Sequence, residues 1–197
     1  MPPLEEAQLK LTLYHGTDAE YADVIITDRF KTKQNRQHWL GNGVYFFTDE
    51  ALAHWWTTKP SKKFGHNIYT PAIVECVFNA PESMILDLRR FIDFKYCFEQ
   101  FQFFFNMLYA KYRKIEEVDI DRLRCTFFDW LFDIKQYAAI IGTFHSNRQP
   151  YYEQFEQDGS GFDNLNLAYT EVQVCIPETM QEYIIEKRQL QVNTKQS

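Results

Sequence analysis

The chain has 197 residues, 45% of them hydrophobic and 17% aromatic, which is enough to bury a substantial core and excludes disorder for most of its length. Its formal net charge of −6 argues against a broad nucleic-acid-binding face, and no stretch reaches the roughly 20 apolar residues of a membrane-spanning helix. The four cysteines are widely spaced and the N-terminus lacks the pattern of a secretion signal, so we expect a cytoplasmic protein with reduced cysteines and no metal site.

The first predicted element is a strand over residues 9–13, where leucines alternate with lysine and threonine. The strand ends at Tyr14-His15-Gly16. Thr17 and Glu20 match the capping-box pattern, in which the first side chain caps a helix and the second reaches back toward it. We therefore expect Thr17 to begin a short helix that continues to about residue 26.

A second motif follows a polar, turn-like segment over residues 27–43, which ends in Gly-Asn-Gly. Residues 44–47 form a brief predicted strand. Asp49 and Glu50 then place acidic side chains at the positive end of a further helix. Residues 72–78 are almost continuously apolar, which is typical of a strand that is buried on both faces.

Two long amphipathic helices are predicted in the middle of the chain, because large apolar residues recur there at spacings of three and four. A charged turn over residues 111–117 separates them, and Asp119 is the expected cap of the second helix. The simpler interpretation is a helical hairpin that packs on the domain's own sheet; the alternative is that part of this apolar surface binds a partner. The two stripes are Phe91, Phe94, Phe98, Phe101, Phe105 and Leu108, and Ile120, Leu123, Phe127, Trp130, Ile134 and Tyr137.

Strand character returns in the last third of the chain, over residues 138–144, 165–176 and about 181–190. Alternation in the second of these strands places Glu171, Gln173 and Cys175 on one face. Strands at both ends with helices grouped between them indicate the α+β class. We expect a single domain over residues 1–197.

The two glycine-containing motifs and the late glutamate together resemble the His-Tyr-Glu branch of the ADP-ribosyltransferase superfamily, which includes poly(ADP-ribose) polymerases and diphtheria-type toxins. The resemblance covers residues 9–57 and 165–185, and the helical middle, about 85–137, is expected to be an insertion. It implies a split pair of mostly antiparallel sheets around a cleft for NAD⁺, which is the substrate. The matching segments are Tyr14-His15-Gly16-Thr17, Leu40-Gly41-Asn42-Gly43-Val44-Tyr45-Phe46-Phe47 and the strand that carries Glu171.

The resemblance assigns the first motif to the dinucleotide. It implies that His15 bonds a ribose hydroxyl of NAD⁺ and that the Gly16 main chain holds the nicotinamide carboxamide, with the Thr17 hydroxyl close by. A basic run without an acidic residue lies between the motifs. We expect Arg36, together with Lys33, to border the pyrophosphate or an anionic acceptor, although a solvated loop is the alternative.

The same resemblance makes Tyr45, Glu171 and His15 the catalytic set, with Tyr45 and Trp56 stacking on the nicotinamide ring. Ala53 stands where the polymerases keep a serine, so one hydrogen bond to the carboxamide is missing. Loss of nicotinamide leaves positive charge on the ribose, and a carboxylate held nearby on a strand stabilises that charge. We expect His15, Tyr45 and Glu171 to converge around the dinucleotide.

The acceptor is expected to be a macromolecule, either a protein or a nucleic acid. Arginine-modifying relatives carry Glu or Gln two residues before the catalytic glutamate; here that residue is Tyr169, which also favours transfer of a single unit over polymer formation. The compact form resembles bacterial toxin or defence effectors, for which an antitoxin or inhibitor protein is a possible partner. Two alternatives stay open: an NAD⁺-dependent RNA 2′-phosphotransferase, and a non-catalytic module that binds NAD⁺ or a protein.

Overall fold

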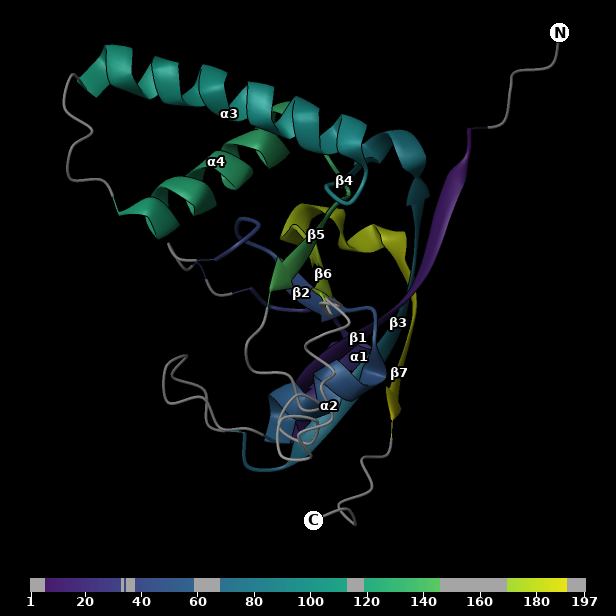
Figure 1. The fold of residues 1–197 in the computed structure, drawn as a ribbon. Helices are drawn as coiled ribbons and strands as arrows, with labels where there is room; N and C mark the ends of the chain where they lie inside the picture. The colour runs from purple at the N-terminus through teal and green to yellow at the C-terminus, as the bar shows by residue number, and fades with distance from the viewer. Residues whose placement is uncertain are drawn as a thin grey trace, which may run out of the picture.

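The computed structural model describes residues 6–32, 34, 38–58, 68–112, 119–145 and 170–190. Seven strands, four α-helices and two 3₁₀ helices are described within these ranges (Figure 1). In chain order they are β1 (Gln8–Asp18), α1 (Ala19–Thr27), β2 (Val44–Phe47), α2 (Glu50–Thr58), β3 (Pro71–Pro81), η1 (Glu82–Met84), β4 (Ile85–Asp87), α3 (Phe91–Tyr112), α4 (Ile120–Lys135), β5 (Ala139–His145), β6 (Thr170–Ile176), η3 (Glu178–Tyr183) and β7 (Ile184–Leu190).

The described strands form a seven-stranded mixed sheet in the order β4-β5-β6-β2-β1-β3-β7. β4 and β5 are parallel and the remaining neighbours are antiparallel. The expected α+β class is confirmed. A split into two sheets was expected; instead the halves β4-β5-β6-β2 and β1-β3-β7 are joined, through the single pair Tyr14↔Phe47 between β1 and β2. Beyond Tyr14, residues 15–18 of β1 pair with β3.

The helices cover the two faces of the sheet unequally. α1 buries Ala22 and Ile25 against one face, beside Leu13 and Val74. The other face is covered at two ends: α2 packs against β1 and β3, whereas α3 and α4 lie together over β4 and β5 (Figure 1). β6 and β2 therefore lie between α2 and the α3–α4 hairpin on this second face.

Three helices, α1, α2 and α4, begin at an acidic side chain that accepts a main-chain hydrogen bond, and one of these caps differs from the expected residue. Asp18 caps α1 by accepting a hydrogen bond from the main-chain N–H of Glu20 at 3.2 Å, so the capping role assigned to Thr17 is wrong. Thr17 instead continues β1, because its main chain pairs with Ala72 of β3. The expected caps of the other helices are confirmed: Asp49 accepts from Ala51 N–H at 2.8 Å, and Asp119 caps α4.

The helical hairpin is confirmed, and its predicted apolar stripes face the core in part. The predicted residues that pack in the core are Phe101, Leu108, Leu123, Phe127, Trp130 and Tyr137. On α3 the buried residues are Cys97 and Phe104, whereas Phe91 is 80% exposed and Phe94 and Phe98 are exposed as well. On α4 the buried residues include Phe127, Phe128, Leu131 and Phe132, and both Ile120 and Ile134 are exposed. The region predicted as a helical insertion also contains β4, which pairs with β5.

Candidate functional site

His15 lies near the end of β1, at the junction with β2. Its Nδ1 lies 2.9 Å from the main-chain carbonyl oxygen of Tyr45, so the first and second sequence motifs are in contact. Because a carbonyl only accepts, Nδ1 carries the proton in this bond and Nε2 keeps a free lone pair. The imidazole is half-buried, with Phe30 and Phe46 at ring-centre distances of 5.2 and 5.7 Å. Burial lowers the pKa of His15 despite the Tyr45 bond, so the ring is neutral at pH 7.

A glutamine far away in the sequence fixes the ring that packs on His15. The Gln181 side chain accepts a hydrogen bond from Phe30 N–H at 3.0 Å and donates to the Phe30 carbonyl at 2.8 Å. Lys187 also binds the carbonyl of Ile25 at the end of α1. Together these bonds hold the segment after α1 against η3 and β7. Sequence analysis missed this clamp, since nothing in the local pattern connects Phe30 with Gln181.

The hydroxyl of Tyr45 is occupied by the turn that precedes β2. It donates to the Gly41 carbonyl at 2.8 Å and accepts from Leu40 N–H at 2.7 Å. Burial raises the pKa of Tyr45 well above its ordinary value. The phenol is therefore a neutral, positioned aromatic ring, with His38 5.4 Å from it in an edge-on arrangement. This arrangement suits stacking on a ligand better than proton transfer.

The turn itself is anchored on α4 by Asp129, which sequence analysis did not single out. The Asp129 carboxylate accepts from Asn42 N–H at 2.5 Å and from the Asn42 side-chain amide at 2.7 Å. Gly41 has φ +85°, a conformation that favours glycine, and a Cβ there would lie 2.9 Å from the Asp129 carboxylate. One helix of the hairpin thus positions the turn that holds Tyr45.

Gly16 allows α2 to approach the main chain of β1. A Cβ at this position would lie 2.6 Å from the carbonyl oxygen of Ala53 and 3.3 Å from Cδ1 of Trp56. The first motif therefore lies close to the helix that carries Trp56 and Ala53. Phe47 adds a second ring on this side, 6.4 Å from Trp56.

Glu171 is buried in β6, with 8% of its surface exposed. It lies opposite Phe144 of β5, and the side-chain amide of Gln173 donates a hydrogen bond to its carboxylate. Burial raises the pKa of Glu171, and the bond from Gln173 acts in the opposite direction. No cation of the described ranges is paired with this carboxylate. A buried carboxylate in such surroundings is uncommon in a folded protein and is a candidate for function.

The register decides which of the expected residues share a face. Tyr45 lies opposite Cys175 and Phe47 opposite Gln173, and directly opposed residues point to the same side of a sheet. Glu171, Gln173 and Cys175 occupy every second position of β6 and therefore point to the same side. The side chains of Glu171 and Tyr45 thus lie on one face of the sheet. His15 lies opposite Val74, whose side chain belongs to the core on the other face.

The expected convergence of the three side chains is therefore not seen: Glu171 and Tyr45 share one face, whereas the His15 ring packs with Phe30 and Phe46 on the other. The structure brings His15 to Tyr45 through a main-chain carbonyl, and it brings Gly16 close to α2, where a Cβ on Gly16 would lie 3.3 Å from Trp56 Cδ1. Within the described part of the chain, no hydrogen bond or ring contact joins Glu171 to His15 or Tyr45. The two described cavities, of about 440 and 190 Å³, are lined by other residues; the smaller one includes Phe30 and Gln181. Arg36, Lys33 and Tyr169 lie outside the described residues.

Other features of the described residues bear on the class of site. They contain no group of three or more His, Cys, Asp or Glu side chains that could hold a metal ion. All four cysteines are buried and none forms a disulfide. None of the helices in the described ranges combines the length and apolar character needed to cross a membrane.

Comparisons with known proteins give one distant relative. The chain is 30% identical over 117 residues to an uncharacterized protein of Methanocaldococcus jannaschii, a match that covers 59% of this chain and 50% of the relative. The chain thus spans about half the length of the relative that it matches. No protein-family model matches the chain, and no solved structure matches it either.

Proposed function

We propose that this chain is an ADP-ribosyltransferase that cleaves NAD⁺ and transfers a single ADP-ribose unit to a macromolecular acceptor. The observation that carries the proposal is the hydrogen bond between His15 Nδ1 and the Tyr45 carbonyl. It joins two motifs that the sequence alone associates only by resemblance. The contact of Gly16 with α2, and the buried Glu171 on the same face as Tyr45, support the same assignment.

Each part of the dinucleotide has a side chain or main-chain group of suitable chemistry in the two motifs, α2 or β6. His15 Nε2 can accept a hydrogen bond from a ribose hydroxyl, because Nδ1 carries the ring proton. The main chain of Gly16 would bind the carboxamide of nicotinamide. Tyr45 and Trp56 would supply aromatic faces for the flat leaving group. Ala53 lies beside Gly16 and offers no hydroxyl, so the carboxamide would have one donor fewer here than in the polymerases.

Glu171 would stabilise the positive charge that develops on the ribose as nicotinamide leaves. The bond from C1′ to the nicotinamide nitrogen breaks and its electron pair stays on that nitrogen, while the acceptor forms the new bond to C1′. A unit charge pair 4 Å apart at an effective dielectric of 20 is worth about 4 kcal/mol, roughly a thousandfold in rate. Burial strengthens the interaction, because water does not screen the carboxylate.

The macromolecular acceptor and the protein partner belong to the same proposal. A role as a toxin or defence effector would explain a compact enzyme of this kind, with an antitoxin or inhibitor protein as a partner. The exposed apolar residues of α3, which include Phe91, Phe94 and Phe98, are a surface on which such a protein could dock.

The test is the release of nicotinamide from NAD⁺ by wild type, Glu171→Gln and, as a matched control, Glu186→Gln. Glu186 is an exposed residue of β7. We expect wild type and the control to release nicotinamide and Glu171→Gln to lose about a thousandfold in rate. NAD⁺ binding without release by wild type would support a non-catalytic module instead. Removal of a 2′-phosphate from RNA would support the phosphotransferase alternative.

A further inference from the structure

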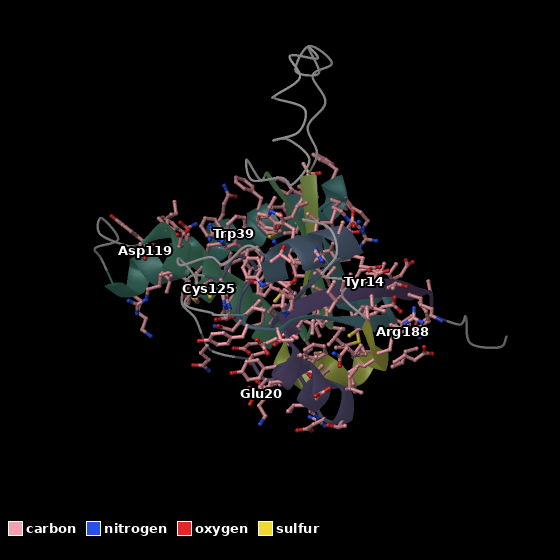
Figure 2. All side chains as sticks on the ribbon, turned by 90° about the horizontal axis from the view of Figure 1, so that it is seen from below. Tyr14, Glu20, Trp39, Asp119, Cys125 and Arg188 are labelled. Carbon is pink, nitrogen blue, oxygen red and sulfur yellow. The ribbon has the colours of Figure 1, made fainter. Side chains whose placement is uncertain are left out.

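Trp39 has an aromatic ring that is packed against its neighbours but partly exposed, on the face of the sheet that carries Glu171. The indole is 41% exposed. Its ring centre lies 4.5 Å from that of Phe144 in an edge-on arrangement, and the Arg124 guanidinium lies 5.7 Å from the ring centre. The neighbouring residue Leu40 is fixed by its bond to Tyr45. Figure 2 shows Trp39 near Cys125 of α4, with Tyr14 and Arg188 toward the other end of the molecule.

The position of this ring relative to Glu171 follows from the strand register. Phe144, on which Trp39 packs, lies directly opposite Glu171 across β5 and β6. Residues opposed in this way have Cβ atoms about 5 Å apart. Trp39 thus packs on Phe144, the direct cross-strand neighbour of Glu171, on the β5 side of β6.

The two rings expected to hold nicotinamide, Tyr45 of β2 and Trp56 of α2, lie on the other side of the same strand. Phe47 is opposite Gln173 across β2 and β6, and Trp56 lies 6.4 Å from Phe47. Glu171 therefore has one aromatic group on its β2 side and another on its β5 side. A substitution at C1′ needs the leaving group and the acceptor on opposite sides of the carbon, because the acceptor approaches from the side opposite the leaving group.

We propose that Trp39, supported by Phe144 and Arg124, is the stacking platform for the acceptor base of a single-stranded nucleic acid; this rests on the proposed function. A partly exposed indole gains free energy from stacking any nucleobase, and the adjacent guanidinium of Arg124, which also pairs with Asp121 at 3.0 Å, suits a backbone phosphate. A side chain of a protein acceptor would not require a flat ring of this kind. Among the described residues, Arg124 is the cation placed on this ring, which is consistent with the acidic composition, since stacking supplies the affinity and one phosphate contact orients the strand.

The transfer step balances with the groups in place. A nucleophilic nitrogen of the stacked base forms the bond to C1′ of the ribose while the bond from C1′ to nicotinamide breaks. The electron pair of the broken bond stays on nicotinamide, which leaves neutral. The proton of the attacking nitrogen passes to the Glu171 carboxylate and then to solvent.

The experiment uses the full chain with single-stranded 12-nucleotide DNA and RNA of each base. It compares wild type with Trp39→Ala, Trp39→Phe and Phe91→Ala, the last removing an exposed aromatic ring on α3. Oligonucleotide binding is measured without NAD⁺, nicotinamide release without oligonucleotide, and transfer with NAD⁺ labelled in the ADP-ribose part. Binding should weaken only about threefold between 50 and 200 mM salt, as one phosphate contact implies.

We expect Trp39→Ala to weaken binding at least tenfold, and to lower the ratio of transfer to nicotinamide release by a similar factor. Trp39→Phe and Phe91→Ala should stay near wild type. The proposal is overturned if wild type binds none of the oligonucleotides, if label passes only to protein, or if Trp39→Ala matches wild type. A raised KM for NAD⁺ in Trp39→Ala would assign the ring to the dinucleotide instead. Absence of nicotinamide release with intact oligonucleotide binding would count against the proposed function alone.

Discussion

Replacing Gln173 by leucine removes the amide that donates to the Glu171 carboxylate and leaves a side chain of similar size. Both residues lie on β6 and neither is fully exposed. The bond stabilises the ionised carboxylate and so lowers the pKa of Glu171, whereas burial favours the protonated form and raises it. Without the amide, burial acts alone and the pKa of Glu171 should rise further.

The size of the effect follows from the kind of bond. A hydrogen bond to a charged group contributes about 1.5–3 kcal/mol, and Glu171 is 8% exposed, so water compensates little of the loss. That free energy corresponds to a roughly ten- to hundredfold change in the protonation equilibrium. Because the pKa rises, ionised enzyme is lost on the acid side. The acid limb of the pH–rate profile for nicotinamide release should therefore move to higher pH.

Two measurements check this prediction independently. Carboxyl ¹³C NMR on Glu-labelled protein follows the titration of Glu171 in wild type and Gln173→Leu, with Glu171→Gln used to assign the signal. The pH dependence of kcat/KM then reports the ionisation in the working enzyme. Gln189→Leu, an exposed substitution on β7, is the matched control. An unchanged titration in Gln173→Leu would show that the amide does not support the charge, and the assigned role of Gln173 would have to be given up.

Two further predictions concern the contacts that join the motifs to the helices. Asp129→Ala leaves both donors of Asn42 without their carboxylate, so we expect a loss of about 2–3 kcal/mol in unfolding free energy by urea denaturation, against little change for the exposed Asp133→Ala. Gly16→Ala would place a Cβ 2.6 Å from the Ala53 carbonyl and should lower Tm by several degrees. Gly142→Ala meets only side-chain atoms, of Leu40 at 3.2 Å and of Phe144 at 3.4 Å, and should cost less. Equal Tm values for the two glycine variants would refute this account of Gly16.

Local sequence patterns were sufficient to predict where strand β2 and the two helices of the hairpin form. Strand β2 was predicted at its observed bounds, 44–47, because four apolar residues follow a glycine turn. The hairpin was predicted from its 3–4 spacing and from Asp119. Which side of α3 is buried was not predictable in the same way. The N-terminal half of α3 carries phenylalanines on several sides, and only packing on α4 and β4 decides that Phe104 is buried and Phe91 is exposed.

The sequence by itself determined the α+β class, the alternation that places Glu171 with Gln173, and the two motifs that suggest an NAD⁺ site, since each depends on residues close together in the chain. Only the tertiary structure decided that His15 meets the Tyr45 carbonyl, that Asp129 holds the turn before β2, and that Trp39 packs beside the strand opposite Glu171. Those contacts join residues 30 or more positions apart. Such contacts are set by how the sheet and helices pack, which local propensity does not encode.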